Sequence, residues 1–178
     1  EIYNYRELRR ELEAEGCVFR SNSDTEVLLH LYAERGEAMV HALRGMFAFG
    51  IWDERAQELF LARDPLGIKP LYYADDGATF RFATLVEALA KGGRVDTGED
   101  VAGIAGFYLF GCVPEPFTFR RGVKALPAGT TMRVGRSGMR EPMQYFSVTE
   151  EFRRAEAAPS DLAPAAIDEQ IRAVFSDS

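Results

Sequence analysis

The sequence has 178 residues, of which 47% are hydrophobic and 28% charged, with a net charge of -7 at pH 7. This length and composition are typical of one compact domain. The acidic balance argues against a nucleic-acid partner, because phosphate contacts need clustered Lys and Arg, and the basic residues here are scattered. No apolar run approaches the roughly 20 residues that cross a bilayer, and nothing resembles a signal peptide, so we expect no membrane partner.

Two cysteines, Cys17 and Cys112, lie far apart in the chain. A disulfide scaffold would need more of them, which favours a reducing, cytoplasmic location. Neither cysteine is N-terminal or paired with a histidine in a motif, so neither is expected to be a nucleophile. His30 and His41 are equally scattered, and we expect no metal site.

Helix-capping patterns begin the chain. Asn4 with Glu7, and Ser23 with Glu26, have the spacing of a capping box, in which two side chains satisfy the first free N–H groups of a helix. Apolar residues at helical spacing follow each box, and glycines end each pattern. The predicted helices cover residues 4–16, 23–36 and 37–44.

Short apolar strands come next. Residues 46–52 and 59–62 are apolar at successive positions, so we expect both faces of each strand to be buried. The other predicted elements are a hairpin of residues 71–74 and 79–83, short helices near 85–90 and 100–110, and a hairpin of residues 130–134 with about 141–146. Helices followed by antiparallel hairpins predict an α+β layered sandwich, not a parallel sheet.

The rigid segment of residues 64–70 contains two prolines and one glycine. We expect Arg63 and Asp64 to hold this turn together. Lys69 is not expected to bind phosphate, because no glycine-rich loop opening a helix accompanies it.

The composition changes to Glu, Ala, Arg and Pro from Thr149 onward. We therefore expect a first domain at residues 1–148, a solvated linker at 149–164, and the first helix of a following domain at 165–178. The chain starts without Met inside an apolar stretch, and its last helix has no convincing C-cap. We expect it to be truncated at both ends.

Five strings of residues carry a family resemblance through their order and spacing. They are residues 1–4, 23–27, 45–49, 62–73 and 126–129. Together they resemble the class II glutamine amidotransferase domain of asparagine synthetases over about residues 1–146. The resemblance implies the fold of N-terminal-nucleophile (Ntn) hydrolases, a four-layer αββα sandwich of antiparallel sheets.

The resemblance also implies a mechanism. In the family, an N-terminal cysteine attacks the glutamine side-chain amide, and the oxyanion is held by the Asn and Gly of an Asn-Gly-Glu string. Only the Glu of that string is present here, as Glu1. The catalytic residues would then lie before residue 1, and we expect the 178-residue chain alone to be inactive.

Two residues match the family's clamp for the amino-acid end of glutamine. Glu1 is the Glu of the string, and Asp24 matches the Asp that pairs with the substrate α-ammonium by a charge-assisted hydrogen bond. Two plainer interpretations stay open. Asp24 would complement the dipole of its helix, and Glu1 would be a frayed chain end.

The resemblance finally implies partners. Ammonia would pass to the protein's own C-terminal synthetase domain, which would amidate a carboxylate, aspartate being the first expectation, with ATP and Mg²⁺. No cofactor is expected in this chain, and a homodimer is left open. Thr84 and Leu85 replace the Ser-Glu usual in the family, which leaves the acceptor less defined. Two rivals remain: the same glutaminase feeding another acceptor, and a non-catalytic interaction module.

Overall fold

The computed structural model describes residues 1–158 and 160–177. It divides into two compact units, Glu1–Phe146 and Ser147–Ser178, which are described separately. No helix in the described part of the chain is long and apolar enough to cross a membrane.

The helices of the N-terminal region are close to those predicted. Helix α1 spans Tyr5–Ala14, helix α2 spans Asp24–Arg35, and the 3-10 helix η1 spans Gly36–Ala42. The predicted third helix is therefore a 3-10 helix that ends two residues early. Leu8 and Leu12 of α1 and Leu31 of α2 are buried, as their spacing indicates.

The two predicted capping boxes differ in the structure. Ser23 caps α2 by accepting a hydrogen bond from the N–H of Thr25, and Glu26 accepts main-chain N–H groups just ahead of the helix. Asn4 occupies the N-cap position of α1, but its side chain makes no capping hydrogen bond. The prediction for Asn4 and Glu7 was therefore wrong, because main-chain groups elsewhere compete for the Asn4 amide.

The first sheet is antiparallel throughout. Its strand order is β1-β2-β6-β7, and β8 also pairs with β6. The last predicted hairpin is present, but its second strand is divided into β7 and β8. The strands are β1 Ala48–Asp53, β2 Glu58–Arg63, β6 Thr130–Gly135, β7 Gly138–Met139 and β8 Met143–Gln144.

The second sheet has three strands in the order β4-β3-β5. Two helices follow β4 in the chain, as predicted. The elements are β3 Tyr72–Asp75, β4 Phe80–Ala83, α3 Val86–Lys91, α4 Val101–Phe110 and β5 Lys124–Ala125.

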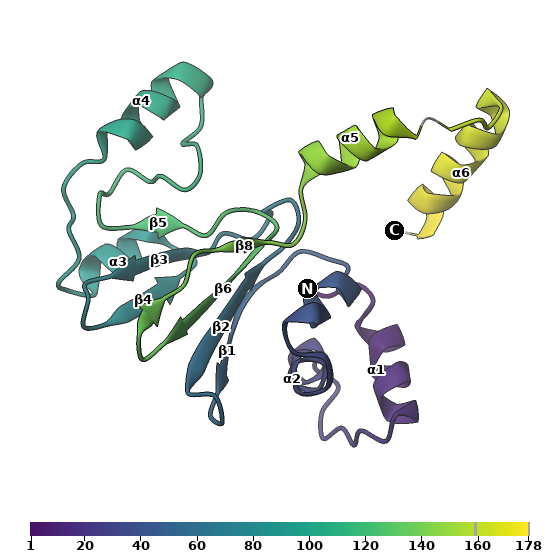
Figure 1. Ribbon diagram of the computed structural model, residues 1–178, viewed down its shortest axis with the longest axis horizontal. Helices are drawn as coiled ribbons and strands as arrows, with labels where there is room; N and C mark the ends of the chain where they lie inside the picture. The colour runs from purple at the N-terminus through teal and green to yellow at the C-terminus, as the bar shows by residue number, and fades with distance from the viewer. Residues whose placement is uncertain (159, 178) are drawn as a thin grey trace. The chain divides into compact units, whose positions relative to one another are not determined.

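Alternate residues of β2 show how the layers stack. Phe60 and Ala62 belong to the apolar cluster beneath α1, α2 and η1, whereas Leu61 belongs to the cluster between the two sheets. Leu89 of α3 closes a third cluster on the far side of the second sheet. Figure 1 shows the resulting order within the first unit, which is helices, sheet, sheet and helix. The predicted four-layer αββα sandwich of antiparallel sheets is confirmed.

Strand β1 departs from its prediction. Phe47 and Ile51 are buried, but Gly50 is exposed and the Trp52 side chain is 53% exposed. The reason is that β1 is the edge strand of its sheet. The ring of Phe82 lies close to Gly50, but Phe82 is itself exposed, so it does not bury this part of β1. Burial on both faces therefore holds for β2 but not for the whole of β1.

The second unit consists of α5, Val148–Ala157, and α6, Pro164–Asp177. The segment expected to be a linker is solvated, since every side chain of α5 is exposed, but most of it is helical. Ser147 caps α5, and Arg153 and Arg154 each pair with a glutamate three residues earlier. The expected terminal helix is present up to residue 177, whereas residue 178 lies outside the described residues. The division into domains stays a prediction.

Candidate functional site

A cleft of about 520 Å³ opens beside the start of α2 and the entry to β1. It brings together four of the five strings that carry the family resemblance, although they are far apart in sequence. Its lining residues are Glu1, Ile2, Asp24, Thr25, Leu28, Met46, Phe47, Ala48, Phe49, Lys69, Pro70, Thr84 and Leu85.

Glu1 and Asp24 both line this cleft. Glu1 is held by main-chain pairing with Met46, whose N–H donates to the Glu1 carbonyl at 3.1 Å and whose carbonyl accepts from the Glu1 nitrogen at 2.7 Å. Ile2 is buried, and its N–H donates to Oδ2 of Asp24 at 3.4 Å. The two predicted clamp residues are therefore neighbours in space, and their role in binding glutamine stays a prediction.

The start of α2 explains how Asp24 is presented. Asp24 is the first residue of the helix and is partly buried. Glu26, two residues later, accepts the N–H groups of Arg20 and Ser21 and the Ser21 hydroxyl. These hydrogen bonds, the Ser21 hydroxyl first, lower the pKa of Glu26 to about 2. Asp24 lies in the first turn and also lines the cleft, so the dipole interpretation and the clamp interpretation are compatible.

Asp64 organises the part of the cleft wall that contains Phe47 and Lys69. Its buried carboxylate accepts hydrogen bonds from the N–H groups of Phe47 at 3.3 Å, Leu66 at 3.2 Å, and Ile68 and Lys69 at 2.9 Å. Because Phe47 and Lys69 line the cleft, one carboxylate sets the spacing between the residue before β1 and the 64–70 turn. A buried carboxylate without such donors would be costly.

Arg63 holds the same turn from the other side. Its guanidinium donates to the carbonyls of Gly67 and Lys69 at 2.8 Å, and to Leu126 and the Glu115 carboxylate at 2.5 Å. The prediction that Arg63 and Asp64 hold the turn is confirmed.

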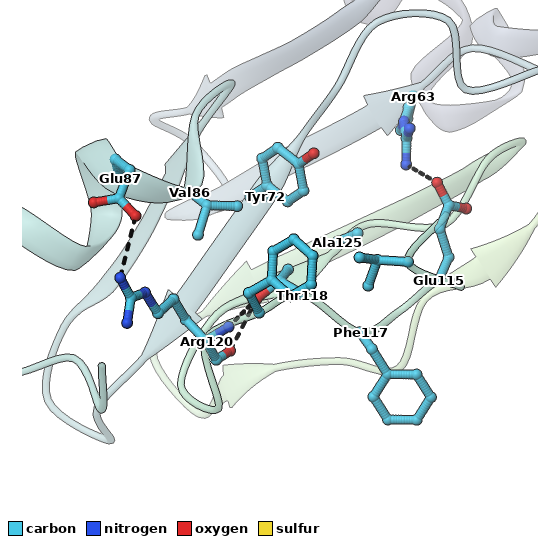
Figure 2. Close-up of a pocket in the computed structure, with 11 residues that line it drawn as sticks. Arg63, Tyr72, Val86, Glu87, Glu115, Phe117, Thr118, Arg120 and Ala125 are labelled. Atoms are coloured by element: carbon cyan, nitrogen blue, oxygen red, sulfur yellow. Dashed lines mark hydrogen bonds and ion pairs between the residues drawn. The ribbon is translucent and has the colours of Figure 1, made fainter. Parts of the chain in front are cut away.

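A second cavity, of about 340 Å³, lies on the far side of Arg63. Figure 2 shows the Arg63–Glu115 pair at one end and Arg120 with Glu87 at the other, and apolar side chains lie between them. Neither Glu1 nor Asp24 lines this cavity. Arg63 thus lines the second cavity and also bonds to the turn that borders the cleft.

The remaining candidates lie away from the cleft. Cys17 packs against the helical cluster, and desolvation raises the pKa of its thiol, which disfavours the reactive thiolate. Cys112 is exposed after α4. His30 lies 3.8 Å from Glu26, and His41 stacks edge-on against Tyr145.

Four residues near the cleft have roles that sequence reasoning missed. Asp64 was expected to hold a turn, but not to bond to Phe47, the residue before β1. Met46 was assigned to a strand, yet it pairs with Glu1. Thr84 and Leu85 were noted as a departure from the family, and both are exposed lining residues of the cleft. Only Thr84 and Leu85 carried a sequence signal, which is their departure from the Ser-Glu usual in the family.

Comparison with known protein families identifies the family to which this chain belongs. The family model described as a glutamine amidotransferase domain matches residues 1–146. The chain belongs to the glutamine amidotransferase domain family. The match ends at the last residue of the first compact unit, so the amidotransferase domain and that unit coincide.

Curated relatives of this amidotransferase domain are longer proteins. Asparagine synthetase [glutamine-hydrolyzing] 1 of Bacillus subtilis (strain 168) is 43% identical over 146 residues, which are 82% of this chain and 23% of that protein. Asparagine synthetase [glutamine-hydrolyzing] 3 of the same organism is 36% identical over 152 residues, which are 85% of this chain and 25% of that protein. The chain therefore spans about a quarter of the length of these relatives.

A solved structure of similar fold is that of glutamine phosphoribosylpyrophosphate amidotransferase from B. subtilis, complexed with ADP and GMP. Its TM-score is 0.53 at 23% sequence identity, over 83% of this chain and 28% of that one. This likeness supports the Ntn-type fold of the amidotransferase domain.

Proposed function

We propose that this chain forms the glutamine-binding part of a glutaminase domain, which releases ammonia from the side-chain amide of glutamine. The observation that carries the proposal is that Glu1 and Asp24 line one cleft. Carboxylates are suitable partners for the α-ammonium group of an amino acid, and the cleft volume is in the range of small-molecule sites.

In the proposed reaction, a nucleophile adds to the amide carbon, ammonia leaves, and water then releases glutamate. In the family that this chain resembles, the nucleophile is a cysteine and the oxyanion is bound by an Asn and a Gly. The residues of this chain bind and orient the amino-acid end of the substrate. Asp64 holds the walls of the cleft at a fixed separation, which preserves that orientation.

The ammonia passes to a C-terminal synthetase domain of the same protein, with aspartate as the proposed acceptor. The names of the curated relatives support this acceptor. We assign ATP and Mg²⁺ to that synthetase domain. Among residues 1–158 and 160–177, no group of three or more His, Cys, Asp or Glu side chains is placed to hold a metal ion. The free cysteines support a cytoplasmic location.

Isotope transfer tests the proposal. The complete protein would be given glutamine labelled with ¹⁵N in the amide, together with aspartate, ATP and Mg²⁺. We expect mass spectrometry to find the label in the amide of asparagine. Labelled ammonia without labelled asparagine would indicate another acceptor. Failure to release labelled ammonia would indicate a non-catalytic interaction module.

A further inference from the structure

The segment of residues 1–3 is held against residues 44–46 by a short antiparallel pairing. Glu1 and Met46 exchange two main-chain hydrogen bonds, and the Tyr3 N–H donates to the Arg44 carbonyl at 2.7 Å. Ile2 lies opposite Gly45 as an isolated β-bridge. This pairing carries Glu1 to the wall of the cleft.

The side chain of Asn4 completes the pairing. In a regular antiparallel ladder, Arg44 would donate its N–H to the Tyr3 carbonyl, because Tyr3 already donates to Arg44. Instead, the Arg44 N–H donates to Oδ1 of Asn4 at 2.9 Å. Nδ2 of Asn4 donates to the Ala42 carbonyl, also at 2.9 Å. One amide therefore bonds both to the end of η1 and to the residue before Gly45.

This pair of partners suits an asparagine and not an aspartate. Arg44 offers a main-chain donor and Ala42 a main-chain acceptor, so the group between them must accept at one atom and donate at the other. An aspartate accepts but cannot donate. The partners also fix the orientation of the amide. The Asn4 amide is thereby unavailable as a cap for α1, which begins at Tyr5.

We propose that Asn4 is a positioning residue that holds Glu1 in the glutamine cleft. This inference rests on the proposed function, because it assumes that Glu1 binds glutamine. The side-chain amide of Asn4 acts by bonding to main-chain groups. It joins the start of α1 to the end of η1, so residues 1–3 cannot shift along residues 44–46. Loss of the amide would let Glu1 move out of register with Asp24.

The test compares Asn4→Asp with Asn4→Ser in the complete protein. Asn, Asp and Ser are similar helix N-caps, so a capping role predicts wild-type behaviour in both variants. A positioning role predicts that both variants raise the KM for glutamine, by about tenfold, the equivalent of one to two lost hydrogen bonds. Synthesis from added ammonia should be unchanged, because ammonia does not use the clamp.

A double variant adds a second readout. Because Asn4 acts through Glu1, Asn4→Asp in a Glu1→Gln background should raise the KM by less than it does alone. Equal effects in both backgrounds would overturn the proposal, and so would an unchanged KM in Asn4→Asp. An equal loss of glutamine-dependent and ammonia-dependent synthesis would also overturn it, since that marks general damage to the fold. If the wild-type protein releases no ammonia from glutamine, the proposed function itself fails.

Discussion

Gly45 lies so close to Glu1 that a β-carbon at position 45 would be 2.3 Å from the Glu1 carbonyl oxygen. Gly45 also has a φ of 140°, a conformation that other residues rarely adopt. The close approach allows residues 1–3 to pair with residues 44–46, and this pairing places Glu1 at the cleft. The glycine is thus part of the geometry of the candidate glutamine site, although it does not line it.

Gly45→Ala should therefore disturb both the fold and the cleft. Strain at such a position costs about 1–3 kcal/mol, and the steric overlap adds to it. Urea unfolding of the complete protein would measure the loss of stability. Gly138→Ala is a matched control, because Gly138 has a φ of 98° and no atom within 4 Å of an added β-carbon. If the two variants lost equal stability, the close packing of Gly45 against Glu1 would not contribute to the stability of the fold.

The layered core predicts a contrast between two aromatic residues on neighbouring strands. Phe60 on β2 is fully buried, whereas Trp52 on β1 is 53% exposed. Phe60→Ala should cost about 3–5 kcal/mol, because it empties a packed aromatic site. Trp52→Ala should cost about 1 kcal/mol or less. Similar urea midpoints for the two variants would contradict the four-layer arrangement.

The periodic parts of the fold could be predicted from the sequence. Leu8, Leu12 and Leu31 lie where helical spacing places them, and β2 is buried on both faces as its continuous apolar run indicates. Strand β1 has an equally apolar sequence, yet Trp52 is exposed. Local pattern does not record which strand will lie at the edge of its sheet, so it could not distinguish the two strands.

The site was less predictable than the fold. The family strings single out Glu1 and Asp24, which both line one cleft, and their role in binding glutamine stays a prediction. Asn4 makes no capping hydrogen bond whereas Ser23 makes one, although the two patterns are equivalent in sequence. The difference arises from partners 38 and 40 residues away, which local spacing cannot reveal. Asp64 is similar, since its bond to Phe47 crosses between two elements.

Asp64→Asn should destabilise the domain and impair glutamine use. The wild-type carboxylate accepts four main-chain N–H groups in a buried position, and an amide would direct its own N–H₂ group at some of them. Each donor left unpaired costs about 1–3 kcal/mol. A urea midpoint would measure this, and the KM for glutamine should rise. Wild-type stability would show that Asp64 does not organise the cleft wall.

Glu26 predicts a pH-dependent contribution to stability. Its pKa in the folded protein is lowered to about 2, mainly by the Ser21 hydroxyl and the N–H of Arg20. A depressed pKa means that the ionised group stabilises the fold above its ordinary pKa of about 4.3. This stabilisation is lost as the pH falls from there to about 2.

The measurement is the unfolding midpoint of Glu26→Gln and wild type as a function of pH. The wild type should be more stable near neutral pH, and the difference should shrink below pH of about 4. Glu7→Gln is the matched control, because Glu7 holds the same position in α1 as Glu26 does in α2. A difference between wild type and Glu26→Gln that is constant with pH would contradict the prediction.

The steady-state kinetics of Asp24→Asn in the complete protein test the central claim most directly. Asp24 is proposed to pair with the α-ammonium group of glutamine, which ammonia does not need. The account predicts that the KM for glutamine rises by about tenfold or more, the loss of a charge-assisted hydrogen bond, while synthesis from added ammonia keeps its wild-type rate. An unchanged KM for glutamine would contradict it and would leave Asp24 as a residue that only complements the dipole of α2.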